Sequence, residues 1–77
     1  MDAESWWFCY RVVDDDGPKK WVAHHGGGPF ESYSAATNAI MRIRPYRGDQ
    51  YSDPILAKSG EDAARQANLR GFPPFLP

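Results

Sequence analysis

The chain has one cysteine among its 77 residues, and this scarcity removes several kinds of small protein from consideration. Cys9 cannot form an internal disulfide, so the disulfide-stapled folds of small secreted proteins are excluded. A closed zinc site would need more cysteine or histidine ligands at metal-binding spacing, and the only histidines are the neighbours His24 and His25. We therefore expect no metal and no cofactor, and a reducing compartment, the cytoplasm, suits this cysteine usage.

Long apolar runs, a signal peptide and an excess of one charge are also missing. No apolar run approaches the roughly 20 residues that cross a membrane, and the acidic start Met1–Glu4 is unlike a signal peptide. The net charge of −1 argues against a dedicated nucleic-acid-binding protein, because such proteins are usually strongly basic. We expect a protein without membrane contact.

No set of catalytic residues stands out either. Cys9 with His24 and His25 could begin a thiolate–imidazole pair, but adjacent strand residues point to opposite faces, so both histidines cannot meet one thiol. A small buried thiol and two histidines at a strand end are the simpler interpretation. The sequence therefore predicts a protein that is not an enzyme.

What the chain does have is aromatic side chains, which make up 14% of its residues. A length of 77 residues predicts one small domain, residues 1–77, which buries only about 60% of the surface of its unfolded chain. Each aromatic group therefore matters for the core. The pattern of strand-like and helix-like segments predicts an α+β fold.

The strongest strand signal is a β-hairpin that carries all three tryptophans. Aromatic and β-branched residues fill 5–13, turn formers fill 14–18, and a second strand-like run covers 19–25. Alternation along the first strand places Trp6, Phe8, Tyr10 and Val12 on one face and Trp7, Cys9, Arg11 and Val13 on the other. Phe8, Tyr10 and Val12 continue as an alternating apolar row and are expected to point inward, which leaves Trp7, Arg11 and Val13 outward.

Two helices follow the hairpin. Ser32 is a predicted N-cap, and a helix ending before Pro45 would bury its inner face. A short third strand is expected over 54–58, and Ser59 would cap a second helix that reaches about Arg70. The predicted order is β-β-α-β-α, and the predicted inner face of the first helix consists of Tyr33, Ala36, Ile40 and Ile43.

The Pro- and Phe-rich residues 71–77 form an extended tail with two interpretations. The tail could be a polyproline ligand for another protein. It could instead lay Phe72, Phe75 and Leu76 across its own domain, which we favour because a small core needs every apolar group it can recruit.

The hairpin also gives the first hypothesis for function. One helical layer covers only one face of a small sheet, so the second face would leave large apolar groups exposed for a partner. Trp and Arg often dominate binding interfaces, and a carboxylate cluster would steer a basic partner. The face of Trp21 depends on the hairpin register, since a shift of one residue moves it across the sheet. The predicted partner-binding residues are Trp7, Arg11, Asp14, Asp15, Asp16 and Trp21.

A basic run at the end of the first helix gives an alternative. Arg42, Arg44 and Arg47 with Tyr46 suit phosphate contact and base stacking, which would make the protein a small nucleic-acid-binding domain. Three charges give only a weak, salt-sensitive attraction, and cations at a helix C-terminus are also favoured by the helix dipole. A solvated helix end is the simpler interpretation.

In its small size, its Trp-rich hairpin, its acidic tip at 14–16 and its lack of a catalytic set, the chain resembles the single-domain inhibitors made by phages and other mobile elements, the anti-CRISPR proteins among them. That resemblance implies stoichiometric binding to a nuclease or a guide-RNA surveillance complex, which would block target DNA or nuclease recruitment. It assigns no role to any single residue. The sequence thus predicts a non-enzymatic protein-binding module; it identifies neither the partner nor the oligomeric state.

Overall fold

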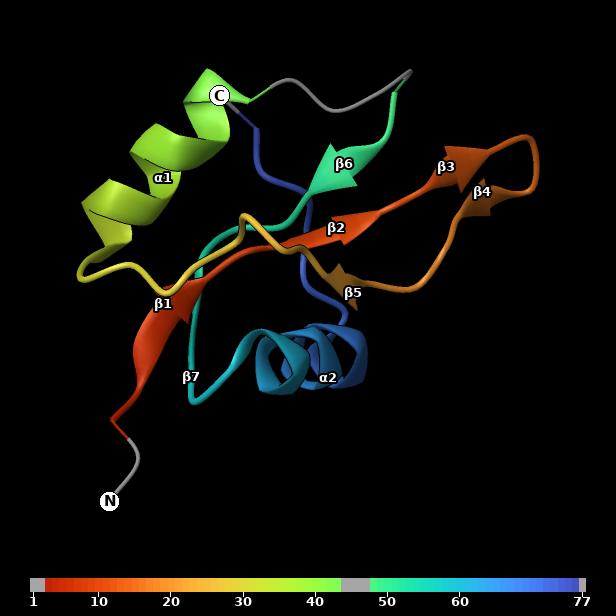
Figure 1. Cartoon of the computed structure of the whole chain (residues 1–77). Helices are drawn as coiled ribbons and strands as arrows, with labels where there is room; N and C mark the ends of the chain where they lie inside the picture. The colour runs from red at the N-terminus through yellow and green to blue at the C-terminus, as the bar shows by residue number, and fades with distance from the viewer. Residues whose placement is uncertain (1–2, 44–47, 77) are drawn as a thin grey trace.

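The computed structural model of the chain describes residues 3–43 and 48–76, and its strands lie between two helices (Figure 1). Helix α1 spans Tyr33–Arg42 and helix α2 spans Gly60–Arg70. The strands are β1 Ser5–Trp7, β2 Cys9–Arg11, β3 Val13–Asp14, β4 Gly17–Pro18, β5 Val22–Ala23, β6 Gln50–Tyr51 and β7 Ile55–Ala57. The predicted α+β class is confirmed.

The strands pair as three small antiparallel sheets. Strand β2 lies between β5 and β6, β3 pairs with β4, and β1 pairs with β7. The predicted hairpin is present as the β2–β5 and β3–β4 pairs, whereas β1 leaves it to pair with the strand before α2. The predicted order β-β-α-β-α is matched only loosely, because the hairpin is divided and β6 lies where no strand was predicted.

Apolar side chains gather in two clusters, one on each side of the strands. The α2 cluster consists of Cys9, Trp21, Ile55, Ala57, Ala63, Ala64 and Ala67, with Trp7 and Phe72 packed against it. The α1 cluster consists of Phe8, Ile40 and Tyr51, with Tyr10, Phe30, Ala39, Ile43 and Phe75 packed against it.

Both faces of the first strands are therefore covered. The neighbours Phe8 and Cys9 point into opposite clusters, as strand alternation requires. The expectation that one face would stay open is wrong, because the two helices lie on opposite sides of the strands instead of forming one layer (Figure 1).

Helix α1 begins where the sequence predicts. The Ser32 hydroxyl accepts a hydrogen bond from the Ala35 backbone N–H at 3.0 Å, which caps the first turn. Ile40 is buried on the inner face, as predicted. Tyr33 was also expected there but is 48% exposed, because its ring stands edge-on against Trp6, with centroids 5.4 Å apart, outside the α1 cluster.

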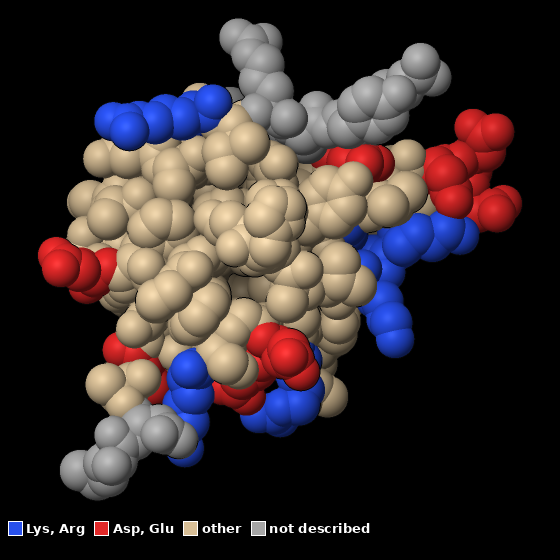
Figure 2. All heavy atoms as spheres, viewed as in Figure 1, with Lys and Arg blue, Asp and Glu red and all other residues tan. Residues whose placement is uncertain are grey.

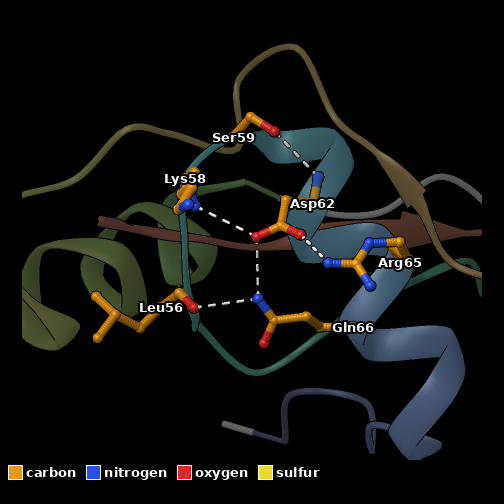
Figure 3. Close-up of polar contacts among 6 residues, drawn as sticks. All are labelled: Leu56, Lys58, Ser59, Asp62, Arg65 and Gln66. Carbon is orange, nitrogen blue, oxygen red and sulfur yellow. Dashed lines mark hydrogen bonds and ion pairs between the residues drawn. The ribbon is translucent and has the colours of Figure 1, made fainter. Parts of the chain in front are cut away.

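Helix α2 is fixed at its start by a network around one carboxylate (Figure 3). The Ser59 hydroxyl accepts from the Asp62 N–H at 3.0 Å, which confirms the predicted cap. The Asp62 carboxylate accepts from the Lys58 N–H at 3.4 Å, from Gln66 Nε2 at 3.1 Å and from the guanidinium of Arg65. The Arg65 bond is the main reason why the pKa of Asp62 lies below its usual value.

The C-terminal tail packs on its own domain. Gly71 ends α2 in the left-handed conformation at φ 65°, which glycine adopts without a side-chain clash. Phe72 then reaches the α2 cluster and Phe75 the α1 cluster, and the Phe75 N–H donates to the Tyr51 carbonyl at 2.7 Å. This is the arrangement that the sequence favours, except that Leu76 is 79% exposed.

Neither α1 nor α2, the helices of the described residues, is long and apolar enough to cross a membrane.

Candidate protein-binding site

Residues 12–20 form an arm that extends past the body of the domain. The arm contains β3, β4 and the turn between them, and it projects at the right of Figure 1. Within the described residues, neither core cluster takes a side chain from 12–20. The arm is therefore built by local contacts and by its attachment at the base.

The tip of the arm is a tight turn made of aspartates. The Asp14 side chain accepts from the Asp16 N–H at 2.9 Å, a local bond that favours turns. Gly17 follows at φ 104°, a conformation that side-chain-bearing residues rarely adopt. The Lys19 N–H donates to the Val12 carbonyl at 2.8 Å and continues the pairing below the tip. These contacts define how the carboxylates are displayed.

The tip carries more negative than positive charge. Lys19 Nζ lies 3.3 Å from an Asp14 carboxylate oxygen and 4.0 Å from one of Asp16. The Asp16 side chain is 89% exposed, and Asp15 is exposed as well. Two of the three carboxylates, those of Asp14 and Asp16, thus share the ammonium group of Lys19. The three aspartates form the red group at the right of Figure 2. This arrangement keeps the acidic character that the sequence predicts.

Asp49 anchors the base of the arm. Its Oδ1 accepts from the Val13 N–H at 3.1 Å, and its Oδ2 accepts from the Tyr10 hydroxyl. Asp49 is 8% exposed, and its hydrogen bond is the main cause that raises the pKa of Tyr10. No local signal in the sequence points to Asp49, because it lies in a polar stretch and its bonding partners are 36 and 39 residues away.

Arg11 lies at the base on the opposite side of the strand from Tyr10. Its guanidinium carbon is 4.2 Å from the centroid of the Trp21 ring, and its Nε donates to Gln50 Oε1 at 2.8 Å. The cation–π contact and the hydrogen bond hold the side chain against the body. Arg11 is half-buried and keeps part of its surface beside the arm.

Trp21 cannot belong to a contact surface in this structure, and its prediction as a partner-binding residue is wrong. Its side chain is 3% exposed in the α2 cluster, and its Nε1 donates to the Phe72 carbonyl at 3.1 Å. The cause is a change of register: two residues lie between Tyr10 and Val13 on one strand, whereas three lie between their partners Pro18 and Val22. The extra residue is a β-bulge, which turns Trp21 toward α2.

The Trp7 side chain also packs against the α2 cluster instead of facing outward. Its Nε1 donates to the Ala57 carbonyl at 2.9 Å, and its ring packs against the α2 cluster. A Cβ atom at Gly28 would lie 2.7 Å from this ring, so the glycine linker covers it closely. The ring is half-buried, and the expected outward face is wrong because α2 and β7 occupy that side.

Two valines near the base of the arm, Val12 and Val22, are exposed. Val12 was predicted to point into the core with Phe8 and Tyr10, but it is 43% exposed because the strand has passed beyond α1. Val22 is 45% exposed. They add apolar surface near the acidic tip.

The residues of the alternative site are described only in part. Arg42 is exposed in the last turn of α1. Arg44, Tyr46 and Arg47 lie outside the described residues, so the nucleic-acid hypothesis stays a prediction.

The possible thiolate–imidazole pair is not assembled. Cys9 is completely buried in the α2 cluster, and burial raises the pKa of its thiol to about 11. His24 stacks on Phe8, on the other side of the strand. Across residues 3–43 and 48–76, no group of three or more histidine, cysteine or acidic side chains is placed to hold a metal ion.

The structure thus places the three aspartates at the tip of the arm and Arg11 at its base, where Arg11 contacts Trp21 and Gln50. Both tryptophans of the predicted set pack in or against the α2 cluster instead. No protein-family model matches the chain, and no match was found to a curated protein or to a solved structure. The arm itself is therefore the basis for a functional assignment.

Proposed function

We propose that the protein is a non-enzymatic protein-binding module that acts by stoichiometric contact through the arm. The observation that carries the proposal is that residues 12–20 form an ordered projection outside both core clusters. A projection that contributes nothing to the core is explained more readily by binding than by stability. The contact surface consists of Asp14, Asp15 and Asp16 at the tip and Arg11 at the base.

The charge of the tip supports a basic partner. Carboxylates can occupy an Arg- or Lys-rich surface as phosphate groups do, through charge-assisted hydrogen bonds. Proteins that hold nucleic acid carry such surfaces, because phosphate contacts dominate their affinity. The resemblance to anti-CRISPR inhibitors supplies a target class of this kind, a nuclease complex guided by nucleic acid.

The surroundings of Cys9 support the non-enzymatic part of the proposal. A nucleophilic cysteine needs a thiolate and access to substrate. Cys9 is 0% exposed, and its raised pKa keeps the thiol protonated at neutral pH.

A charge-matched capture experiment tests the proposal. The protein is immobilised and exposed to a bacterial lysate, together with the double variant Asp15→Lys, Asp16→Lys and the control Glu4→Lys, Glu31→Lys. All four positions are exposed. Each variant replaces two carboxylates by two lysines, so both change the net charge equally. We expect a protein bound by the wild type and by the control at low salt, and a loss of about ten-fold or more for the tip variant, because close charges steer association.

Circular dichroism should show both variants folded. Equal capture by the tip variant and the wild type would contradict the proposal. A mobility shift of DNA or RNA that the tip variant retains, and that replacing Arg42, Arg44 and Arg47 by alanine abolishes, would favour the nucleic-acid-binding alternative.

A further inference from the structure

Residues 24–30, which we call the strap, run beside the backbone of residues 6–8 (yellow in Figure 1). At one end, Trp6 and Phe30 exchange two backbone hydrogen bonds of 3.0 and 2.9 Å. At the other end, the Phe8 N–H donates to the Gly27 carbonyl at 2.9 Å. The strap therefore covers a strand edge that would otherwise present free backbone groups.

His24 shapes the Gly27 end of the strap. Its Nδ1 accepts from the Gly26 N–H at 3.1 Å, and its carbonyl accepts from the Gly27 N–H at 2.8 Å. These two bonds close a tight turn that aims the Gly27 carbonyl at Phe8. The turn lies so close to the strand that a Cβ atom at Gly27 would be 2.4 Å from the Phe8 carbonyl oxygen.

The imidazole ring of His24 lies among aromatic rings and beside a second histidine. The centroids of Phe8, Tyr51 and Tyr10 are 5.7, 5.4 and 5.9 Å away, and that of His25 is 4.8 Å away in a stacked arrangement. Burial is the main cause that lowers the pKa of His24, and His25 adds to it.

Among the described residues, the other titratable groups on this side do not offset a positive charge on the ring. The pKa values of Tyr10 and Tyr51 are raised, so both hydroxyls stay neutral near pH 6. The Asp49 carboxylate faces this side through its bond with Tyr10, and its second oxygen accepts from Val13. Neither oxygen of Asp49 bonds to His24.

We propose that His24 and the turn it closes are a proton-operated latch, which holds the strap on Phe8 at neutral pH and releases it in mild acid while Phe30 stays paired with Trp6. A protonated Nδ1 is a donor and cannot accept the Gly26 N–H.

The pH range follows from the direction of the shift. The folded protein holds the His24 proton less tightly than the unfolded chain, whose histidine pKa is 6.5. The stabilisation is therefore complete above pH 6.5 and is lost as the pH falls below it toward the lowered folded-state value. Release of the strap would leave the Phe8 N–H free to pair with another strand. The latch does not depend on the proposed role of the arm.

Amide hydrogen exchange, read residue by residue by NMR between pH 7.5 and pH 5, tests the latch. Protection factors corrected for the intrinsic rate are compared at Phe8, at Trp6 on the other end of the strap, and at Ser52, whose N–H donates to the Cys9 carbonyl within the core. We expect the protection of Phe8 to fall about ten-fold or more, since one proton shifts an equilibrium by up to ten-fold per pH unit. Protection at Trp6 and Ser52 should stay within about two-fold on the same scale.

Two variants complete the test. His24→Asn keeps a side-chain acceptor for the N–H two residues on but does not titrate, so the protection of Phe8 should become independent of pH. His25→Asn keeps the latch and should retain the fall. The proposal is overturned if wild-type Phe8 protection does not change, if His24→Asn shows the same fall, or if all three amides lose protection together.

Discussion

The Ser52 side chain shows how this small core accommodates a polar group. Ser52 is completely buried, and its hydroxyl accepts from the Cys9 N–H at 2.9 Å and donates to the Asp53 carbonyl at 3.0 Å. An unsatisfied buried group costs about 1–3 kcal/mol, so these bonds matter in a domain with little stability to spare. Ser52 also ties the first strands to the segment after β6.

Ile40 provides a test of the α1 cluster at the same scale. It is 4% exposed, whereas its neighbour Met41 is 58% exposed on the same helix. We expect Ile40→Ala to lower the free energy of unfolding by about 2–5 kcal/mol, because it leaves a cavity against Phe8 and Tyr51. Met41→Ala should change it by less than about 0.5 kcal/mol. Urea unfolding followed by tryptophan fluorescence measures both, and equal effects would mean that the cluster is misassigned.

Among the elements, the arm depends on how the segment that follows it, at Trp21, is bound to α2. The Asn68 side chain accepts from the Trp21 N–H at 2.7 Å and donates to the Trp21 carbonyl at 2.9 Å. One amide group thus takes the place of a neighbouring strand at the β-bulge. We expect this bidentate contact to fix the direction in which the arm leaves the body.

Replacing Asn68 by alanine should therefore act at a distance from α2. We expect a loss of about 1–3 kcal/mol in the free energy of unfolding, because two backbone groups of Trp21 lose their partner. Leu69→Ala, one residue further on at a 75% exposed position, is the matched control and should be nearly neutral. Chemical shifts of residues 12–20 should move in the first variant alone; similar shifts in both would show that Asn68 does not hold the arm.

The helix boundaries were the features that the sequence predicted best. Ser32, Ser59 and Gly71 act through neighbours within five residues, so their cap roles can be recognised locally. Strand β6 was missed, because two residues in a polar stretch give no periodic signal. Its identity as a strand comes from pairing with β2, whose paired residues are 39 and 41 positions away.

The arrangement of the whole molecule was the least predictable part. The sequence placed Trp7 and Cys9 on one face and Phe8 and Tyr10 on the other, and this alternation is confirmed. Which helix covers which face depends on contacts between distant segments, and no local pattern encodes them. The prediction of an open face followed from assuming one helical layer. Because α2 covers that face, Trp7 and Trp21 pack against it and do not form a contact surface.

The whole domain should be stable without a metal ion or a disulfide. Structural metals contribute folding energy directly, so their removal lowers a melting temperature. We expect thermal unfolding curves of the full chain to coincide with and without EDTA, and with and without dithiothreitol. A clear drop in melting temperature with either reagent would contradict this expectation.

The pairing of β1 with β7 also bears on how fast the molecule can form. Trp7 and its partner carbonyl at Ala57 are 50 residues apart, and Trp21 and Phe72 are 51 residues apart. Chains dominated by such distant contacts fold slowly, because large loops must close before any pairing is gained. We expect the helices to form early, because their caps are local, and the rings of Trp7 and Trp21 to be buried only when Ala57 and Phe72 have reached them. During that interval the nascent molecule is most exposed to aggregation.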